Sequence, residues 1–201
     1  VLIVTAGGFS VDKLTVGENT GNTGTLTVSG GDVRIGTGSE DFIVGGYDIS
    51  VPGNAVGTVD LTDADSVTIN VARVELGFAR VSSGIGVSAN SARGTLLLSE
   101  AGDNSVTATS LEISEADSGA NGNRESKLTL GGNTNTLNID TITVGAKKGR
   151  GLLDIVAGGS ITINGTAGAP ALANLVEGDN NVNTSTQSKG VVDFRGGSVT
   201  G

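Results

Sequence analysis

The sequence of 201 residues contains no histidine, cysteine, methionine or tryptophan, and these absences exclude several kinds of chemistry. Without histidine or cysteine, the chain has neither a Ser-His-Asp nor a Cys-His nucleophilic system, and it lacks the usual ligands of a zinc site. The absence of cysteine leaves the redox compartment open, because proteins without disulfides occur both in the cytosol and outside the cell. Carboxylates are the groups that remain for catalysis.

Basic residues are also scarce. The chain has 12 Lys and Arg against 21 Asp and Glu, which gives a formal net charge of -9. This charge argues against nucleic acid and anionic membrane surfaces as partners, because phosphate groups are bound by clustered Lys and Arg. The one compact basic group, Lys147, Lys148 and Arg150, is interpreted as solvated charge in a short loop. No stretch is long and apolar enough to span a bilayer.

Glycine is abundant, with 34 residues, and it accompanies a pattern that the chain repeats seven times. Each copy opens with two apolar residues at alternate positions. The copies follow one another at intervals of roughly two to four dozen residues, which is typical of stacked repeats. The seven openings are Leu2-Ile3-Val4, Leu26-Thr27-Val28, Val59-Asp60-Leu61, Leu96-Leu97-Leu98, Leu128-Thr129-Leu130, Leu153-Asp154-Ile155 and Val192-Asp193-Phe194.

Within a copy, the alternation predicts short strands with one buried and one wet face. No window of the sequence repeats with the 3.6-residue period of a helix. One copy, Leu96 to Ser114, contains three alternating apolar pairs with Ser, Thr and Glu between them. These pairs are Leu96 and Leu98, Val106 and Ala108, and Leu111 and Ile113. We therefore expect about three short strands in each copy.

These features predict an all-β fold, a three-sided parallel β-helix (β-solenoid) that forms a single domain over residues 1–201, with six to seven coils. Parallel sheets normally have both faces covered by helices, and the sequence of this chain predicts no helix. A coil solves the problem because the chain wraps around its own apolar interior. Right-handed winding is expected, since strand crossovers are overwhelmingly right-handed and the six-residue repeat of left-handed helices is missing.

Inserts of variable length are predicted at one corner of the coil, where they change the surface without touching the core. The main ones are Thr37 to Val56, Phe78 to Arg93 and Thr166 to Lys189. Two inserts carry an aromatic residue, Tyr47 and Phe78. We interpret both as packing against the coil, and stacking on sugar rings or on a partner is the alternative.

Stacked repeats usually shield their end strands with an amphipathic cap, and no cap is recognisable in this sequence. Two interpretations stay open: the chain is part of a longer protein, or its ends stack on neighbouring copies. In the second case the first and last strands are the assembly edges. The residues at these edges are Val1, Leu2, Ile3, Val4, Val191, Val192, Phe194 and Val199.

The segments Gly24 to Gly31 (GTLTVSGG) and Leu14 to Gly17 (LTVG) carry a resemblance. They resemble the repetitive β-strand regions of bacterial autotransporter passengers and of large secreted surface proteins with a sorting tail. This resemblance covers most of the chain and implies a bacterial protein located outside the cell or on its surface.

Acidic residues gather at two turns of the pattern. Asp60, Asp63 and Asp65 follow one strand, and Glu100 with Asp103 lies at the equivalent corner of the next copy. Paired carboxylates act as acid and base in polysaccharide-cleaving enzymes, and three carboxylates also supply oxygens for a structural calcium ion. We interpret them instead as turn residues that bond local backbone amides, and we predict no catalytic residue and no resident cofactor.

Taken together, the sequence predicts a non-catalytic extracellular structural protein, a rod-like subunit of a surface fibre, filament or matrix. Its expected partners are neighbouring copies of itself. A carbohydrate-binding adhesin module, with glycans as partners, is the first alternative, and a polysaccharide-cleaving β-helix enzyme is the second.

Overall fold

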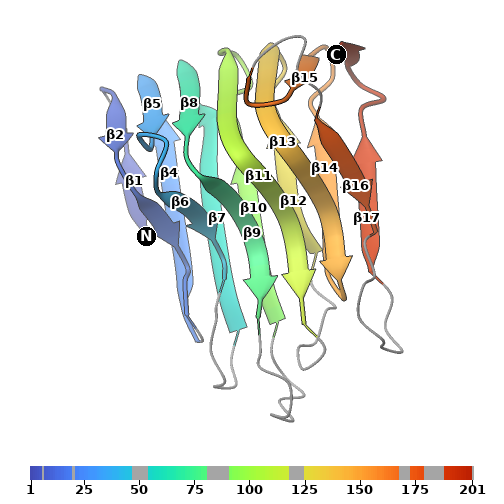
Figure 1. Ribbon diagram of the computed structural model, residues 1–201. Coiled ribbons are helices and arrows are strands. Elements are labelled where there is room, and N and C mark those ends of the chain that lie inside the picture. Colours follow the sequence, from blue (N-terminus) through green and yellow to red (C-terminus); the bar gives the residue numbers. More distant parts are fainter. Residues whose placement is uncertain are drawn as a thin grey trace.

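The computed structural model describes residues 1–5, 7–19, 21–46, 54–80, 91–117, 125–167, 173–178 and 188–200. The regular elements of these residues are all β-strands, and every paired strand runs parallel to its neighbours (Figure 1). The strands form two sheets of seven and eleven strands.

The seven-stranded sheet takes one strand from each copy of the sequence pattern, in chain order. Its strands are β1 (Leu2–Val4), β4 (Thr23–Ser29), β7 (Asn54–Asp63), β10 (Ser91–Leu97), β12 (Glu125–Leu130), β14 (Arg150–Ile155) and β17 (Lys189–Asp193). β1 and β17 therefore lie at opposite edges of this sheet.

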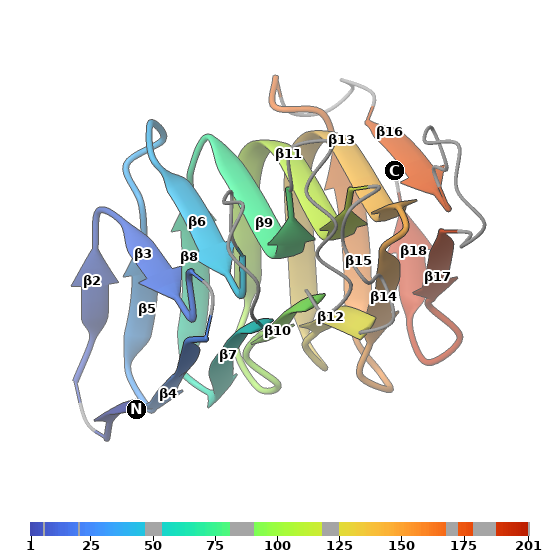
Figure 2. The same ribbon diagram turned by 90° about the horizontal axis from the view of Figure 1, so that it is seen from below.

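The eleven-stranded sheet, called the large sheet below, contains the remaining strands. One row consists of β2 (Phe9–Val11), β5 (Asp32–Ile35), β8 (Ser66–Asn70), β11 (Asn104–Ala116), β13 (Thr134–Lys147), β15 (Ser160–Asn164) and β18 (Ser198–Thr200). A second row lies beside the first and consists of β3 (Leu14–Val16), β6 (Asp41–Val44) and β9 (Arg73–Ala79). In this row β9 pairs with the second half of β11. The last strand, β16 (Asn174–Glu177), pairs with the second half of β13. Figure 2 shows β3, β6 and β9 beside one another.

The predicted three-sided β-helix with three short strands per coil is wrong, because the structure has two parallel sheets rather than three faces. β11 and β13 run through 13 and 14 residues without a break, so their second and third apolar pairs belong to one sheet. Only two residues, Thr109 and Ser110, separate Ala108 from Leu111, and neither is glycine. The strand continues through this short link, and only its alternation of buried and exposed residues changes phase there.

The strands also extend further into the predicted inserts than expected. Phe78 belongs to β9, Arg93 to β10 and Val56 to β7. The rest of the three inserts falls largely on residues 47–53, 81–90, 168–172 and 179–187, which lie outside the described residues, and so does Tyr47.

The alternating apolar residues form one hydrophobic core between the two sheets. Leu26, Val59, Leu96, Leu128 and Leu153 occupy paired positions in five neighbouring strands, and each is at most 2 % exposed. Each such side chain stabilises the fold by about 1.5 to 3 kcal/mol. The sequence pattern therefore identified the core residues of the inner copies correctly, whereas Leu2 of the first copy is exposed and Val192 and Phe194 of the last are half-buried.

Candidate functional site

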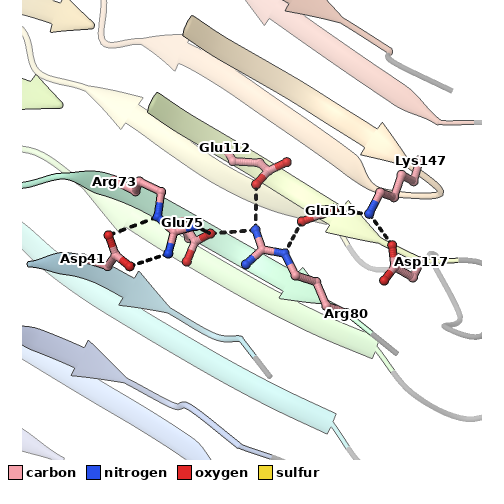
Figure 3. A network of polar contacts seen from close by, with 8 residues as sticks. All are labelled: Asp41, Arg73, Glu75, Arg80, Glu112, Glu115, Asp117 and Lys147. Carbon is pink, nitrogen blue, oxygen red and sulfur yellow. Dashed lines mark hydrogen bonds and ion pairs between the residues drawn. The ribbon is translucent and has the colours of Figure 1, made fainter. Parts of the chain in front are cut away.

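A network of eight charged side chains covers part of the outer face of the large sheet (Figure 3). Its members come from β6, β9, β11 and β13 and from the residues that directly follow β9 and β11. We call it the Arg80 network. It consists of Asp41, Arg73, Glu75, Arg80, Glu112, Glu115, Asp117 and Lys147.

The alternation of the strands places its two central glutamates. Val74 and Leu76 are buried in the core, so Glu75 between them points to the outer face of β9. Glu112 has the same position in β11, and it is the register partner of Glu75. Two carboxylates therefore stand directly opposite each other on neighbouring strands.

Arg80 joins three glutamates. Its Nη2 donates to Glu75 Oε1 at 2.6 Å and to Glu112 Oε2 at 2.9 Å, and its Nε donates to Glu115 Oε2 at 2.6 Å. The guanidinium carbon lies 4.5 Å from the centre of the Phe78 ring. Phe78 is only 2 % exposed, which confirms packing rather than stacking on an external ligand.

Two further cations extend the network on either side of Arg80. Arg73 donates to both carboxylate oxygens of Asp41, at 3.1 and 2.5 Å, and its Nη1 lies 3.5 Å from Glu75 Oε1. The Nζ of Lys147 contacts the carboxylates of Glu115 and Asp117.

Burial and neighbouring charges shift the pKa values of the central groups. Burial, reinforced by the charge of Glu115, raises the pKa of Glu112 to about 7, even though Arg80 acts in the opposite direction. For Glu115, burial also acts to raise the pKa, but hydrogen bonds from Lys147 and Arg80 outweigh it and the pKa lies below its ordinary value. Burial acts to lower the pKa of Arg80, and the surrounding glutamates more than compensate, so that it is raised.

Chemically, this arrangement binds five carboxylates with three cations. Glu75 and Glu115 are 3 % and 6 % exposed, so their oxygens face protein donors rather than an open cleft. A group of this kind joins strands of four neighbouring copies, because its members lie on β6, β9, β11 and β13. The geometry of the network therefore fits a structural role, in which its ion pairs hold these neighbouring strands together.

Two of the three acidic residues around the end of β7 accept hydrogen bonds, one from a near neighbour in the sequence and one from another copy of the pattern. Asp60 Oδ1 accepts from the backbone N and the hydroxyl of Thr62, at 3.1 and 2.7 Å, and Asp65 Oδ2 accepts from the backbone N of Gly31 at 3.0 Å. Asp60 therefore makes the predicted local bonds, but it lies within strand β7 and not in a turn, whereas the bond of Asp65 reaches the neighbouring copy of the pattern. Asp63 does not combine with them into a metal site, since no group of three potential ligands for a metal ion occurs among the described residues.

Glu100 and Asp103, the second acidic pair, lie exposed at the neighbouring turn. The backbone N of Glu100 donates to the carbonyl of Thr62, and the carbonyl of Asp103 accepts from Val67. Their described hydrogen bonds are therefore backbone bonds that hold the turns of neighbouring copies together.

The predicted assembly edges lie in the outermost strands. At the first edge, Val1, Leu2 and Ile3 are 95 %, 53 % and 61 % exposed, and Val4 is half-buried. At the other edge, Val199 is 53 % exposed. Val191, Val192 and Phe194 are half-buried there.

The compact basic group is less solvated than expected. Lys147 is half-buried, and its ammonium is bound by Glu115 and Asp117. Lys148 and Arg150 are half-buried too, and the backbone N of Arg150 donates to Ser114 Oγ at 2.9 Å. The interpretation of this group as freely solvated charge is therefore wrong for Lys147.

Sequence reasoning missed the Arg80 network altogether. One signal was available, because a glutamate stands between the two apolar residues of the third pair both in Val74-Glu75-Leu76 and in Leu111-Glu112-Ile113. Arg80 gave no such signal, since it lies in a segment that was predicted to be an insert.

Comparisons with known protein families, with curated proteins and with solved structures found no match to this chain. Among the described residues, no helix has the length and apolar character needed to cross a membrane.

Proposed function

We propose that this chain is a non-catalytic structural subunit of an extracellular bacterial fibre or matrix, and that copies join end to end through their outermost strands. The supporting observation is the position of the large exposed apolar side chains in the described part of the chain. There are five of them, Val1, Leu2, Ile3, Leu175 and Val199, and each lies in or next to an outermost strand.

Edge strands supply the means of association. At the first edge of the described structure, β1 pairs only with β4 and β2 only with β5. At the second edge, β17 pairs only with β14 and β18 only with β15, so each of these strands has one side without a partner among the described residues. Unpaired N–H and C=O groups at a sheet edge accept another strand, and flanking apolar side chains add the gain from burial. β1 and β17 lie at opposite edges, so pairing between them builds a chain of copies rather than a closed dimer.

The first edge also leaves the core incompletely covered. A cavity of about 300 Å³ opens there, and Val1, Leu2, Leu14 and Leu26 are among the residues that line it. An apolar residue of a second protein molecule, joined at this edge, would fill this space. The proposal of an extracellular location rests on the resemblance of the Gly24 to Gly31 segment to secreted repeat regions and on the Gly-rich composition.

The test is sedimentation velocity and electron microscopy of two variants, Leu2→Lys at the first edge and Val199→Lys at the second. We expect the wild type to form polymers that grow with concentration. Each variant alone should remain monomeric, because one of its two edges is blocked by charge. An equimolar mixture should form one-to-one dimers and nothing longer, since each variant retains the edge that the other has lost.

Thr58→Lys is the matched control, because it places the same charge in the middle of the seven-stranded sheet and should leave polymers intact. Far-UV circular dichroism checks that all variants keep their β-structure. A wild type that stays monomeric at every concentration, or edge variants that polymerise like the wild type, would contradict the proposal.

A further inference from the structure

The outer face of the large sheet carries a second surface, which differs in chemistry from the Arg80 network. Across β8, β11, β13 and β15, four outward positions in register bear hydroxyl groups. These residues are Thr68, Ser105, Thr136 and Thr162.

A second column runs beside the first, two residues further along each strand. It consists of Asn70, Thr107, Asn138 and Asn164, which are again in register. The residues between the two columns, such as Ile69, Val106 and Leu137, are buried in the core, so both columns lie on the outside. We call the eight residues the hydroxyl–amide face.

Much of the hydrogen-bonding capacity of this face is unused within the described protein. Asn164 Nδ2 donates to Asn138 Oδ1 at 3.3 Å, whereas the side chains of Asn70, Thr107 and Thr136 have no hydrogen-bond partner among the described residues. Hydroxyl and amide groups both donate and accept. The face therefore presents hydrogen-bond donors and acceptors to a ligand at regularly spaced points.

The eight residues of the face carry no charge, although the chain as a whole has a net charge of -9, and one exposed cation, Arg34 of β5, lies at the edge of the face as the register partner of Thr68. An anionic polymer would meet Arg34 at this edge but no cation among the eight residues, and the net negative charge of the protein would repel it. Nucleic acid is disfavoured for the same reason, because its binding depends on Lys and Arg. A ligand that matches the face is neutral and rich in hydroxyl groups.

The spacing favours a polymer over a single sugar. Neighbouring strands lie about 4.8 Å apart, and positions two residues apart in one strand are separated by about 6.6 Å. Each hydrogen bond to such a surface contributes little net free energy. Many equal contacts along a repeating ligand add up, since each further contact forms within an already bound complex.

We propose that the hydroxyl–amide face binds a neutral polysaccharide that lies across the strands, parallel to the two columns. The polymer's hydroxyl groups exchange hydrogen bonds with Thr107, Thr136 and Asn138 in the centre of the face. This binding does not depend on end-to-end association, because the face lies on the middle strands and not on the edges.

The experiment measures adsorption of the purified chain to insoluble cellulose, chitin and β-1,3-glucan, with soluble alginate as the anionic comparison. The double variant Thr107→Val/Thr136→Val removes two central hydroxyls and keeps the side-chain shape. We expect its affinity for at least one neutral polymer to fall about tenfold, as the loss of two hydrogen bonds implies. The affinity of the wild type should hardly change with salt concentration, because no charge is involved.

The matched control is Thr58→Val/Thr95→Val, two paired outward threonines on the seven-stranded sheet, which should bind like the wild type. Asn138→Asp is a second, nearly isosteric variant that places a charge in the face and should also weaken binding. Circular dichroism and thermal unfolding confirm that each variant is folded. The proposal is overturned if the wild type adsorbs to none of the neutral polymers, if it binds alginate better, or if the control loses as much affinity as the face variant.

Discussion

Glu112 lies directly opposite Glu75 on the neighbouring strand, and the guanidinium of Arg80 contacts both carboxylates, at 2.9 and 2.6 Å. Like charges at paired positions destabilise a sheet. The pair is therefore tolerated because Arg80 stands between the two carboxylates.

Replacing Glu112 by glutamine should stabilise the protein at pH 8 and leave it almost unchanged at pH 5. The pKa of Glu112 is raised from 4.5 to about 7, so the folded protein binds this proton more tightly than the unfolded chain does. The resulting stability is fully present below pH 4.5 and is lost as the pH rises through about 7. Urea unfolding at both pH values should give a gain of about 1 to 2 kcal/mol at pH 8.

The charged groups around Glu112 are Glu75 and Arg80 on the β9 side, Glu115 on its own strand, and Lys147 of β13, which acts through Glu115. Their opposing effects set the size of the change but not its sign. Glu100→Gln is the control, because it removes an exposed carboxylate outside the network and should have no effect at either pH. A Glu112→Gln variant that is less stable than the wild type at pH 8 would show that the pKa of Glu112 is not raised.

Replacing Arg80 by glutamine should cost about 3 kcal/mol or more of unfolding free energy at pH 7, because it removes the one cation that contacts Glu75, Glu112 and Glu115 together. Among the described residues, this change leaves Glu75 and Glu115 with only Arg73 and Lys147. Glu75 and Glu115 are 3 % and 6 % exposed and have little access to water. The double variant Arg80→Gln/Glu112→Gln should cost less than the Arg80 variant alone, since one of the repelling charges is gone. Urea unfolding of all four proteins in a double-mutant cycle measures this coupling, and costs that simply add would contradict the shared role of Arg80.

The sequence alone predicts the strands and their buried residues. Leu96 and Leu98, and likewise Leu128 and Leu130, alternate as expected and are at most 1 % exposed. The division into sheets was not predictable from the same pattern. Alternation shows which side of a strand is buried, but it does not show whether two consecutive strands bend away from each other or continue as one, as they do at Thr109.

Prediction of the Arg80 network would have required the register between the strands. Glu75 and Glu112 are 37 positions apart in the sequence, and they meet only because β9 and β11 pair at these residues. Arg80 reaches them from beyond the end of β9, where no repeat pattern indicates its direction. A cluster that brings together residues of several copies thus depends on the exact offset between copies, and inserts of variable length hide this offset.

Replacing Asn135 by valine should destabilise the protein by about 2 to 4 kcal/mol, because several buried polar groups lose their partners. Asn135 is fully buried, and its Oδ1 accepts from the backbone N of Gly131 at 2.9 Å and from Asn104 Nδ2 at 3.0 Å. Its Nδ2 donates to the carbonyl of Ser160 at 3.0 Å, which joins two neighbouring copies. Thermal and urea unfolding measure the loss. Asn70→Val is the same exchange at an exposed site and should stay within about 0.5 kcal/mol of the wild type.

The last prediction concerns Gly77, where the backbone bends at the end of the core. Gly77 has a φ of +67°, and a Cβ atom there would lie 1.8 Å from Ser126 Oγ and 2.8 Å from the backbone N of Gly94. Gly77→Ala therefore combines left-handed strain with a clash between the two sheets. We expect a loss of more than about 3 kcal/mol in urea unfolding, whereas left-handed strain alone costs about 1 to 2 kcal/mol.

Gly158→Ala separates the two causes, because Gly158 has a φ of +91° but open space where its Cβ would lie. It should lose only the cost of left-handed strain. Ser126→Gly in the Gly77→Ala background should recover part of the difference, since the equivalent positions of the neighbouring strands, Gly94 and Gly151, are glycines already. Equal losses for Gly77→Ala and Gly158→Ala would mean that the two sheets can separate at this point, and that the close approach of Gly77 to Ser126 does not limit how neighbouring copies stack.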